Sequence, residues 1–158
     1  CGATHGYFPI LYVNEKTVRA QIAVGVQTYK KYFGKTPNGI WLPECGYIPE
    51  ADKYLKEFAV DIYEKRVKEI YNMFSESIPY PNIKIRKMST RWGVCNKKNK
   101  TITLNLELIK KDIKYLDYVI VHELCHFIHF DHSKEFWNLV SKYCPNYKQL
   151  RKEMRDDN

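Results

Sequence analysis

His122-Glu123-Leu124-Cys125-His126 lies within an apolar stretch of the chain and has the pattern His-Glu-x-x-His. Two histidines four residues apart lie one above the other on the same face of a helix. Neutral imidazoles in that arrangement bind zinc, and the glutamate beside the first histidine serves as general base toward a water molecule. The pattern therefore predicts a metal-binding helix and metal-assisted hydrolysis, most often of a peptide bond.

The helix that carries this pattern is predicted to be buried. Its apolar residues cover nearly the whole helix circumference: Tyr115, Leu116, Val119, Ile120, Leu124, Phe127 and Ile128. Asp112 is the expected N-cap. A carboxylate and two imidazoles inside such a helix are unfavourable unless they bind something, and a metal ion is the simplest partner.

The third metal ligand is a choice between His129 and His132. Both follow the motif, and of the five histidines in the chain only His5 lies elsewhere. A helix would place His129 about 10.5 Å along the axis from His122, too far for one ion to bind both through bonds of about 2 Å. His132 stands where the helix can end and the chain turn back, just before Ser133, a good N-cap for a new helix. The spacing favours His132.

Several motifs together resemble the YgjP-like metallopeptidases, small zincins related to the SprT-like and WLM groups. The likeness runs from about Glu64 to Met154. The motifs that carry it are Arg91-Trp-Gly-Val-Cys95, Thr101-Ile-Thr-Leu-Asn105, Leu116-Asp-Tyr-Val-Ile-Val-His-Glu-Leu-Cys-His126 and Asp131-His-Ser-Lys-Glu-Phe-Trp137.

This resemblance implies one Zn²⁺ ion bound by His122, His126 and His132, with Glu123 as the catalytic residue. The family usually has Ser where Val94 stands, and Asn-Trp-Arg-Leu where this chain has residues 105–108. The metal site is intact, whereas substrate contacts from that segment depart from the family pattern. Arg91 and Asn105 are the candidates for substrate binding or for stabilising an oxyanion.

The amino-terminal part resembles a different family, the α-glucan-acting glycoside hydrolase family 57. The motifs lie within about residues 1–60: Cys1-Gly-Ala-Thr-His-Gly-Tyr-Phe-Pro-Ile-Leu11, Val18-Arg-Ala-Gln-Ile-Ala-Val-Gly25 and Gly39-Ile-Trp-Leu-Pro-Glu-Cys-Gly-Tyr47. In that family Glu44 would match the nucleophile. A retaining glycosidase also needs a second carboxyl about 5–5.5 Å away, and no matching later motif follows. Glu44 is therefore expected to be inactive.

These likenesses predict an α+β chain in two parts. Residues 1–60 form a truncated, mostly helical fragment with one short strand, and residues 61–158 form a zincin-like domain with helices packed on a short sheet. The chain begins with Cys rather than Met, which suggests a piece of something longer.

Local signals give the expected elements. Asn14 caps a helix over 17–33 that Gly34 ends. A short strand is expected over 39–42, then helices over 48–60 and 61–75, and strands around Ile83–Ile85 and over 101–106. A charged helix over 147–155 closes the chain.

Composition limits the partners. The net charge is +8, of which the part from Asp61 carries +6 (19 Lys and Arg against 13 Asp and Glu). A peptide or protein substrate is expected, and nucleic acid is a less favoured partner. Five cysteines without a C-x-x-C pair indicate a reducing cytoplasm. No stretch is apolar and long enough for a membrane span.

Two alternative functions remain open from the sequence. The first is a zinc-dependent hydrolase of nucleotide phosphoanhydrides, with Lys84, Arg86 and Arg91 meeting phosphates. The second is an inactive fusion fragment of a family 57 enzyme. A comparison of peptides with nucleoside triphosphates as substrates distinguishes the first alternative from a peptidase. Metal analysis of the purified protein tests the second alternative.

Overall fold

The computed structural model describes residues 14–35, 37 and 52–156, and it confirms the α+β class. The chain divides into two compact units, Cys1–Ile62 and Tyr63–Asn158. The strand expected over 39–42 lies outside the described residues. Among the residues that are described, no helix is long and apolar enough to cross a membrane.

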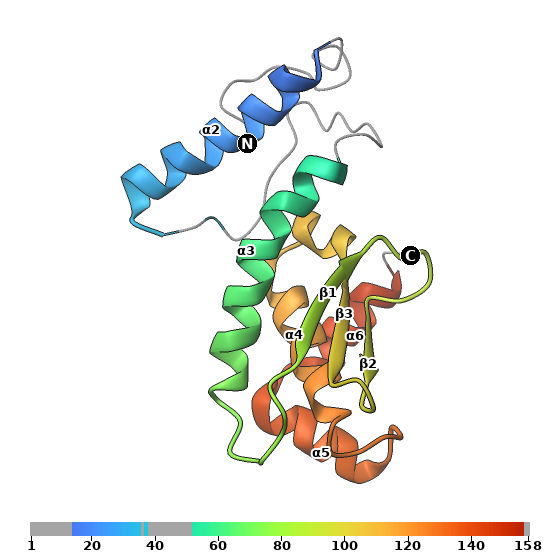
Figure 1. Cartoon of the computed structure of the whole chain (residues 1–158). Coiled ribbons are helices and arrows are strands. Elements are labelled where there is room, and N and C mark those ends of the chain that lie inside the picture. The colour runs from blue at the N-terminus through green and yellow to red at the C-terminus, as the bar shows by residue number, and fades with distance from the viewer. Residues whose placement is uncertain (1–13, 36, 38–51, 157–158) are drawn as a thin grey trace. The chain divides into compact units, whose positions relative to one another are not determined.

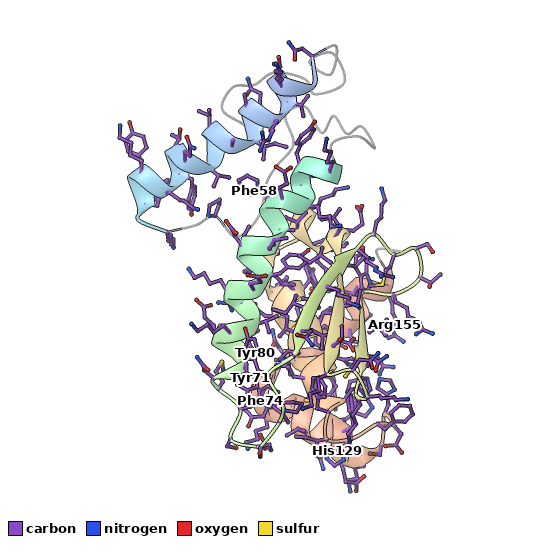
Figure 2. All side chains as sticks on the ribbon, viewed as in Figure 1. Phe58, Tyr71, Phe74, Tyr80, His129 and Arg155 are labelled. Carbon is purple, nitrogen blue, oxygen red and sulfur yellow. The ribbon has the colours of Figure 1, made fainter. Side chains whose placement is uncertain are left out.

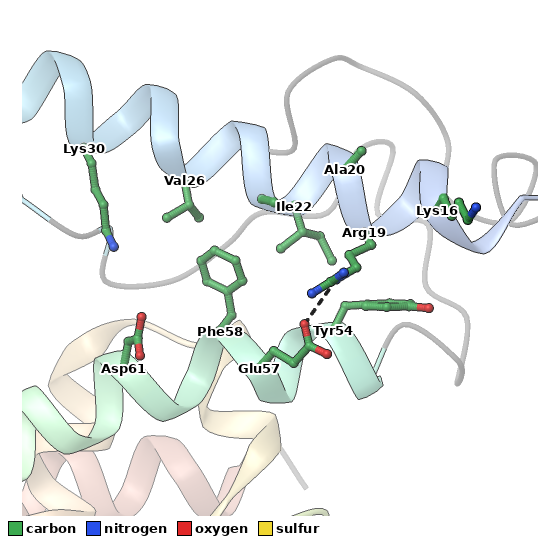
Figure 3. Close-up of a pocket in the computed structure, with 11 residues that line it drawn as sticks. Lys16, Arg19, Ala20, Ile22, Val26, Lys30, Tyr54, Glu57, Phe58 and Asp61 are labelled. Atoms are coloured by element: carbon green, nitrogen blue, oxygen red, sulfur yellow. Dashed lines mark ion pairs between the residues drawn. The ribbon is translucent and has the colours of Figure 1, made fainter.

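The first unit contains helix α2 (Glu15–Phe33), which ends where predicted and begins directly after the predicted cap, two residues before the expected start at 17. The Asn14 side chain accepts a hydrogen bond from the backbone N–H of Lys16. Gly34 closes the helix with φ of 64°, a left-handed conformation that glycine adopts without strain. One face of α2 and the first turns of α3 line an apolar cavity of about 470 Å³, which the ion pair between Arg19 and Glu57 crosses (Figure 3).

Helix α3 (Asp52–Tyr71) is one continuous helix, where the sequence was expected to give two helices with a boundary after Val60. No glycine or proline stands between residues 52 and 71, so nothing interrupts the backbone hydrogen bonds. A boundary was expected after Val60 because the family likeness changes there, although the sequence has no helix-breaking residue at that point. The helix also stops at Tyr71, before the expected end at 75.

The second unit is built on a three-stranded sheet with the strand order β1-β3-β2 (Figure 1). Its strands are β1 (Asn82–Arg86), β2 (Gly93–Asn96) and β3 (Thr101–Asn105). β3 pairs with β1 in parallel and with β2 antiparallel, so β2 is an edge strand. The turn at 97–100 joins β2 to β3, and Lys100 adopts a positive φ of 48°.

Four further helical elements complete this unit. The 3₁₀ helix η3 (Leu106–Lys110) follows β3 directly, so the expected strand ends one residue early. Helix α4 (Ile113–Cys125) packs against β2, β3, η3, α5 and α6. α5 (Lys134–Tyr143) and α6 (Tyr147–Asp156) follow. The predicted caps are present, since the side chains of Asp112 and Ser133 accept from the N–H groups of Lys114 and Phe136.

The core of the second unit lies between the sheet and α4. Its fully buried side chains include Tyr63, Ile102, Leu104, Leu108, Leu116, Ile120, Leu124 and Phe136. Each such aliphatic or aromatic side chain stabilises the fold by roughly 1.5–3 kcal/mol. The Arg66 guanidinium also donates to both carboxylate oxygens of Asp117, at 2.8 and 2.7 Å, which ties the end of α3 to α4. These contacts fix α4, and with it the residues of the predicted motif.

Candidate metal centre

The three histidines predicted as ligands come together at the end of α4. His122 lies in the last turn of the helix, and His126 is its C-cap. The chain then turns, and His132 stands immediately before Ser133, the N-cap of α5. The two helices therefore position two ligands from one and the third from the turn between them.

The Nε2 atoms of the three imidazoles converge on one point. The Nε2 of His122 lies 3.2 Å from that of His126 and 3.1 Å from that of His132. Tetrahedral ligands about 2.0–2.1 Å from a zinc ion are separated by roughly 3.3 Å. Two of the three separations are thus already close to this spacing, and the ligand atoms of all three histidines lie within 4.8 Å of one another. The donor set of three imidazoles suits zinc.

The carbonyl of His129 orients the second imidazole. Nδ1 of His126 lies 3.1 Å from the backbone oxygen of His129, so Nδ1–H donates there and the lone pair of Nε2 faces the other two histidines. The His129 ring is not among the side chains that gather at this point. Nδ1 of His122 is buried and has no hydrogen-bond partner among the described residues.

Aromatic rings pack against the three imidazoles, and burial favours the neutral form of His122 and His126. The Phe136 ring lies 4.6–5.0 Å from all three of them, and the Trp137 ring stacks on His132 at 5.5 Å. Burial first, and then the neighbouring imidazoles, lowers the pKa of His122 to about 3. Burial also lowers the pKa of His126. Neutral imidazole is the form that binds a metal.

Glu123 is buried between α4 and β2, with only 4% of its surface exposed. Burial raises the pKa of its carboxyl to about 8, while a hydrogen bond from the backbone of Cys95 and the charge of Arg91 act in the opposite direction. The carboxylate fits only because residue 93 is glycine. A Cβ at Gly93 would stand 2.5 Å from Glu123 Oε1 and 2.8 Å from Val119 Cγ1.

The free edge of β2 faces Glu123. Antiparallel strands alternate between residues that bond across the pair and residues whose N–H and C=O point away. Because the N–H of Asn105 donates to the carbonyl of Trp92, Gly93 and Cys95 belong to the outward-pointing set. The Cys95 N–H therefore reaches the Glu123 carboxylate, and the backbone of Gly93 stays free at the edge.

The two predicted substrate-contact residues have different positions. Arg91 is exposed and lines the cavities on both sides of Glu123. Asn105 is buried, with 3% of its surface exposed. Its amide nitrogen donates to the carbonyls of Met88 and Arg91, and its oxygen accepts from the N–H groups of Met88 and Glu107. Asn105 thus holds the loop that carries Arg91.

Two cavities meet at the predicted catalytic group and share Arg91, Gly93, His122 and Glu123 in their walls. One, of about 320 Å³, extends toward α6, and its other walls include Trp92, Tyr118, Arg151, Met154 and Arg155. The other, of about 370 Å³, extends toward the turn after α4 and includes Val94, Cys95, Lys97, His126, Phe130 and His132. Lys84 and Arg86 lie on β1, the opposite edge strand, and line neither cavity.

Glu44, the residue matched to a glycosidase nucleophile, lies outside the described residues. The sequence also did not single out Gly93 or the Cys95 N–H as supports for Glu123. The motif Arg91-Trp-Gly-Val-Cys95 was the only signal for them, and their role depends on a contact with a residue 30 positions away in the chain.

Comparisons with known proteins bear out both likenesses. The sequence matches the family described as YgjP-like, metallopeptidase domain, over residues 46–157. The metallopeptidase zymogen jannalysin of Methanocaldococcus jannaschii has a similar crystal structure, with a TM-score of 0.51 and 27% identity over 60% of this chain and 95% of that one. A 1,4-alpha-glucan branching enzyme of Thermococcus kodakarensis is 60% identical over 50 residues, 32% of this chain, and the chain spans 7% of that enzyme.

Proposed function

Because this chain belongs to the YgjP-like metallopeptidase domain family, we propose that it hydrolyses peptide bonds with one zinc ion bound by His122, His126 and His132 and with Glu123 as general base. The observation that carries the proposal is the convergence of three imidazole Nε2 atoms, two pairs of them at 3.1 and 3.2 Å, beside a buried carboxylate. The match to jannalysin supports the same chemistry.

In the proposed reaction, the metal, Glu123 and the Cys95 N–H have separate roles. Zinc, when bound, lowers the pKa of water to about 7 and polarises a carbonyl oxygen. Glu123 accepts the proton of the attacking water and then delivers it to the nitrogen of the leaving amine. The Cys95 N–H holds the carboxylate in place, and a cation among the imidazoles returns the raised pKa of Glu123 toward its ordinary range.

The edge of β2 favours an extended peptide as the substrate. A peptide laid along a free strand edge adds main-chain hydrogen bonds to the sheet. The backbone of Gly93 is available for this, and it adjoins the Glu123 carboxylate. Two of the three cations predicted to meet nucleotide phosphates, Lys84 and Arg86, lie on β1 and line neither cavity.

We assign Arg91 to substrate contact and Asn105 to positioning. Arg91 is exposed in both cavities, whereas the four hydrogen bonds of the Asn105 amide all go to backbone groups. We keep the division into a family 57-like fragment at 1–60 and a peptidase domain at 61–158, with Glu44 inactive. We also keep a cytoplasmic location, which the free thiols of Cys95, Cys125 and Cys144 support.

Hydrolysis assays test the proposal. Purified chain loaded with one equivalent of zinc is given an unstructured protein, a set of unrelated peptides and nucleoside triphosphates. We expect peptide bonds to be cleaved, a chelator to abolish cleavage and added zinc to restore it, with no release of phosphate. Phosphate release without peptide cleavage would move the function to phosphoanhydrides, and no hydrolysis of any substrate by the zinc-loaded chain would favour the inactive fragment.

A further inference from the structure

The cavity toward α6 has an unusual concentration of positive charge. Arg91 approaches it from the loop before β2, and Arg151 and Arg155 from α6. The two α6 residues are four positions apart, so they lie on one face of that helix. Arg155 can be located at the outer end of α6 in Figure 2. Among the described residues, Glu123 is the one carboxylate in the cavity wall, and it is buried and bonded to β2.

No carboxylate among the described residues forms an ion pair with these three arginines. The carboxylate of Glu153, on the same helix, accepts from Tyr115 and Gln149 and pairs with Lys114 instead. The Arg151 guanidinium stacks over the Trp137 ring at 4.7 Å, which orients it without neutralising its charge. The side chains of Asp156 and Asp157 are outside the described residues. Within the part of the chain that the structure describes, the three guanidinium groups of the cavity wall have no carboxylate partner.

Much of the remaining wall is apolar. Trp92 and Met154 line the same cavity, and so does Tyr118, which is 7% exposed. A side chain with a methylene stem and a charged end would place the stem against these groups and the end among the guanidinium groups. A guanidinium binds a carboxylate through two parallel hydrogen bonds, a geometry that an amide or a hydroxyl reproduces poorly.

We propose that this cavity is a substrate subsite for a carboxylate, so that the enzyme prefers peptides with a carboxylate on one side of the scissile bond. The carboxylate has two sources: a Glu or Asp side chain close to the scissile bond, or the carboxyl end of the peptide. The inference rests on the proposed peptidase function and adds the substrate class. It concerns the side of the scissile bond that lies toward α6, because Arg151 and Arg155 line only that cavity.

The test uses matched peptides that differ in one group. One sequence is made with Glu or Gln at each position near the scissile bond, and with a free or amidated carboxyl end. We expect at least one carboxylate to raise kcat/KM about tenfold or more over its amide, as one charge-assisted pair in a partly exposed site allows. A gain from an internal Glu identifies a side-chain subsite, and a gain from the free end alone identifies removal of carboxy-terminal residues. Equal rates for every pair would overturn the proposal.

Variants link the preference to the cavity. Arg155→Gln leaves the stack of Arg151 on Trp137 intact and should reduce the preference several-fold, mainly through a higher KM. Arg151→Gln with Arg155→Gln should bring it close to one, with zinc still bound. The control, Lys148→Gln with Lys152→Gln, removes two charges from the same helix outside the cavity wall and should keep the preference. If the preference survives the loss of both arginines, the carboxylate is recognised elsewhere, for example by the metal.

A binding measurement separates this inference from the proposed function. The same peptides are titrated into zinc-loaded Glu123→Gln protein, which needs no turnover. Tighter binding of the carboxylate peptide, lost in the variant that also lacks both arginines, supports the subsite even if the wild-type chain cleaves no peptide. Equal binding of carboxylate and amide peptides overturns the subsite while leaving peptidase activity to the hydrolysis assay.

Discussion

The candidate site has two sides, a helix wall formed by α4 and a strand wall formed by β2 and the loop before it, and the two are built in different ways. On one side, α4 supplies His122, Glu123 and His126 within five consecutive residues, and their arrangement follows from helical spacing alone. On the other side, the loop before β2 and the strand itself supply Arg91, Gly93 and the Cys95 N–H. Those groups reach the site only because β3 and Asn105 hold them there. In the proposed mechanism, the helix therefore determines which chemistry is available, and the strand determines whether Glu123, the proposed base, is in position to perform it.

The largest expected effect comes from removing the base on the helix wall. Glu123→Gln keeps the shape of the side chain but cannot accept a proton. Peptide hydrolysis should fall by about two orders of magnitude or more, with zinc content unchanged. The measurement is kcat/KM together with metal analysis. Unchanged turnover in this variant, with chelator-sensitive activity in the parent, would place the base on another residue.

A methyl group on the strand wall should have the next largest effect. In Gly93→Ala the new Cβ would meet Glu123 Oε1 at 2.5 Å, so the carboxylate must move. A shift of about 1 Å at a catalytic group lowers the rate by roughly a hundredfold, and we expect a loss of tenfold to a hundredfold in kcat. Zinc content should stay at the parent level because the three atoms nearest to the new Cβ belong to Glu123 and Val119, not to a proposed ligand. Full activity would show that the strand does not position Glu123.

A substitution of Asn105 tests how far the strand wall depends on the hydrogen bonds that this side chain makes to the loop before β2. Asn105→Ala leaves backbone groups of Met88, Arg91 and Glu107 without their partner. The free energy of unfolding should fall by about 2–4 kcal/mol, and kcat/KM by up to about tenfold because the loop loses its anchor. Denaturant unfolding and kinetics on the same preparation measure both. A raised KM with unchanged stability would instead make Asn105 a substrate contact.

The stability of the metal-free protein should depend on pH through the same residues. Between pH 4.5 and about 8 folded Glu123 keeps a proton that the unfolded chain has lost, so the free energy of unfolding falls as pH rises through this window. Between pH 6.5 and about 3 the unfolded chain protonates His122 and the folded protein does not, so the free energy falls as pH drops. Each slope has a limit of about 1.4 kcal/mol per pH unit.

Chemical denaturation across this pH range checks both slopes. Glu123→Gln should remove the decline on the alkaline side and leave the acid side unchanged. An identical pH profile for parent and variant would show that the buried carboxyl is not protonated in the folded, metal-free protein.

The smallest expected effect concerns Glu44, the residue matched to a glycosidase nucleophile. Glu44→Gln should leave peptide hydrolysis unchanged, and neither parent nor variant should release glucose from an α-glucan, because a retaining mechanism needs a second carboxylate. A glucan digestion assay with both proteins is sufficient. Glucose release by the parent that is lost in Glu44→Gln would give the amino-terminal part an activity of its own.

The sequence predicted those parts of the fold that depend on neighbouring residues. Asn14, Asp112 and Ser133 cap helices, and Gly34 ends one, because a side chain or a flexible backbone acts on groups two to four residues away. The spacing of His122 and His126 is local in the same sense. His132 was favoured from its place before Ser133, and the structure brings it to the other two histidines.

The parts that the sequence did not predict depend on contacts across the chain. Gly93 has no positive φ, and only the approach of Glu123 shows why it must be glycine. Asn105 was predicted to bind substrate because its own segment does not show that its side chain binds the backbone of another loop. The Met88 groups that it binds lie 17 residues away in the chain. The boundary expected after Val60 was wrong because nothing there stops a helix.

Metal binding by histidine variants tests the central claim most directly. Purified parent protein should contain about one zinc per chain. His132→Ala should lower zinc affinity sharply, because it removes one of three converging ligands, whereas His129→Ala should retain full occupancy, because His129 contributes its backbone carbonyl rather than its ring. Full zinc content in His132→Ala together with loss of zinc in His129→Ala would contradict the ligand set on which the mechanism rests.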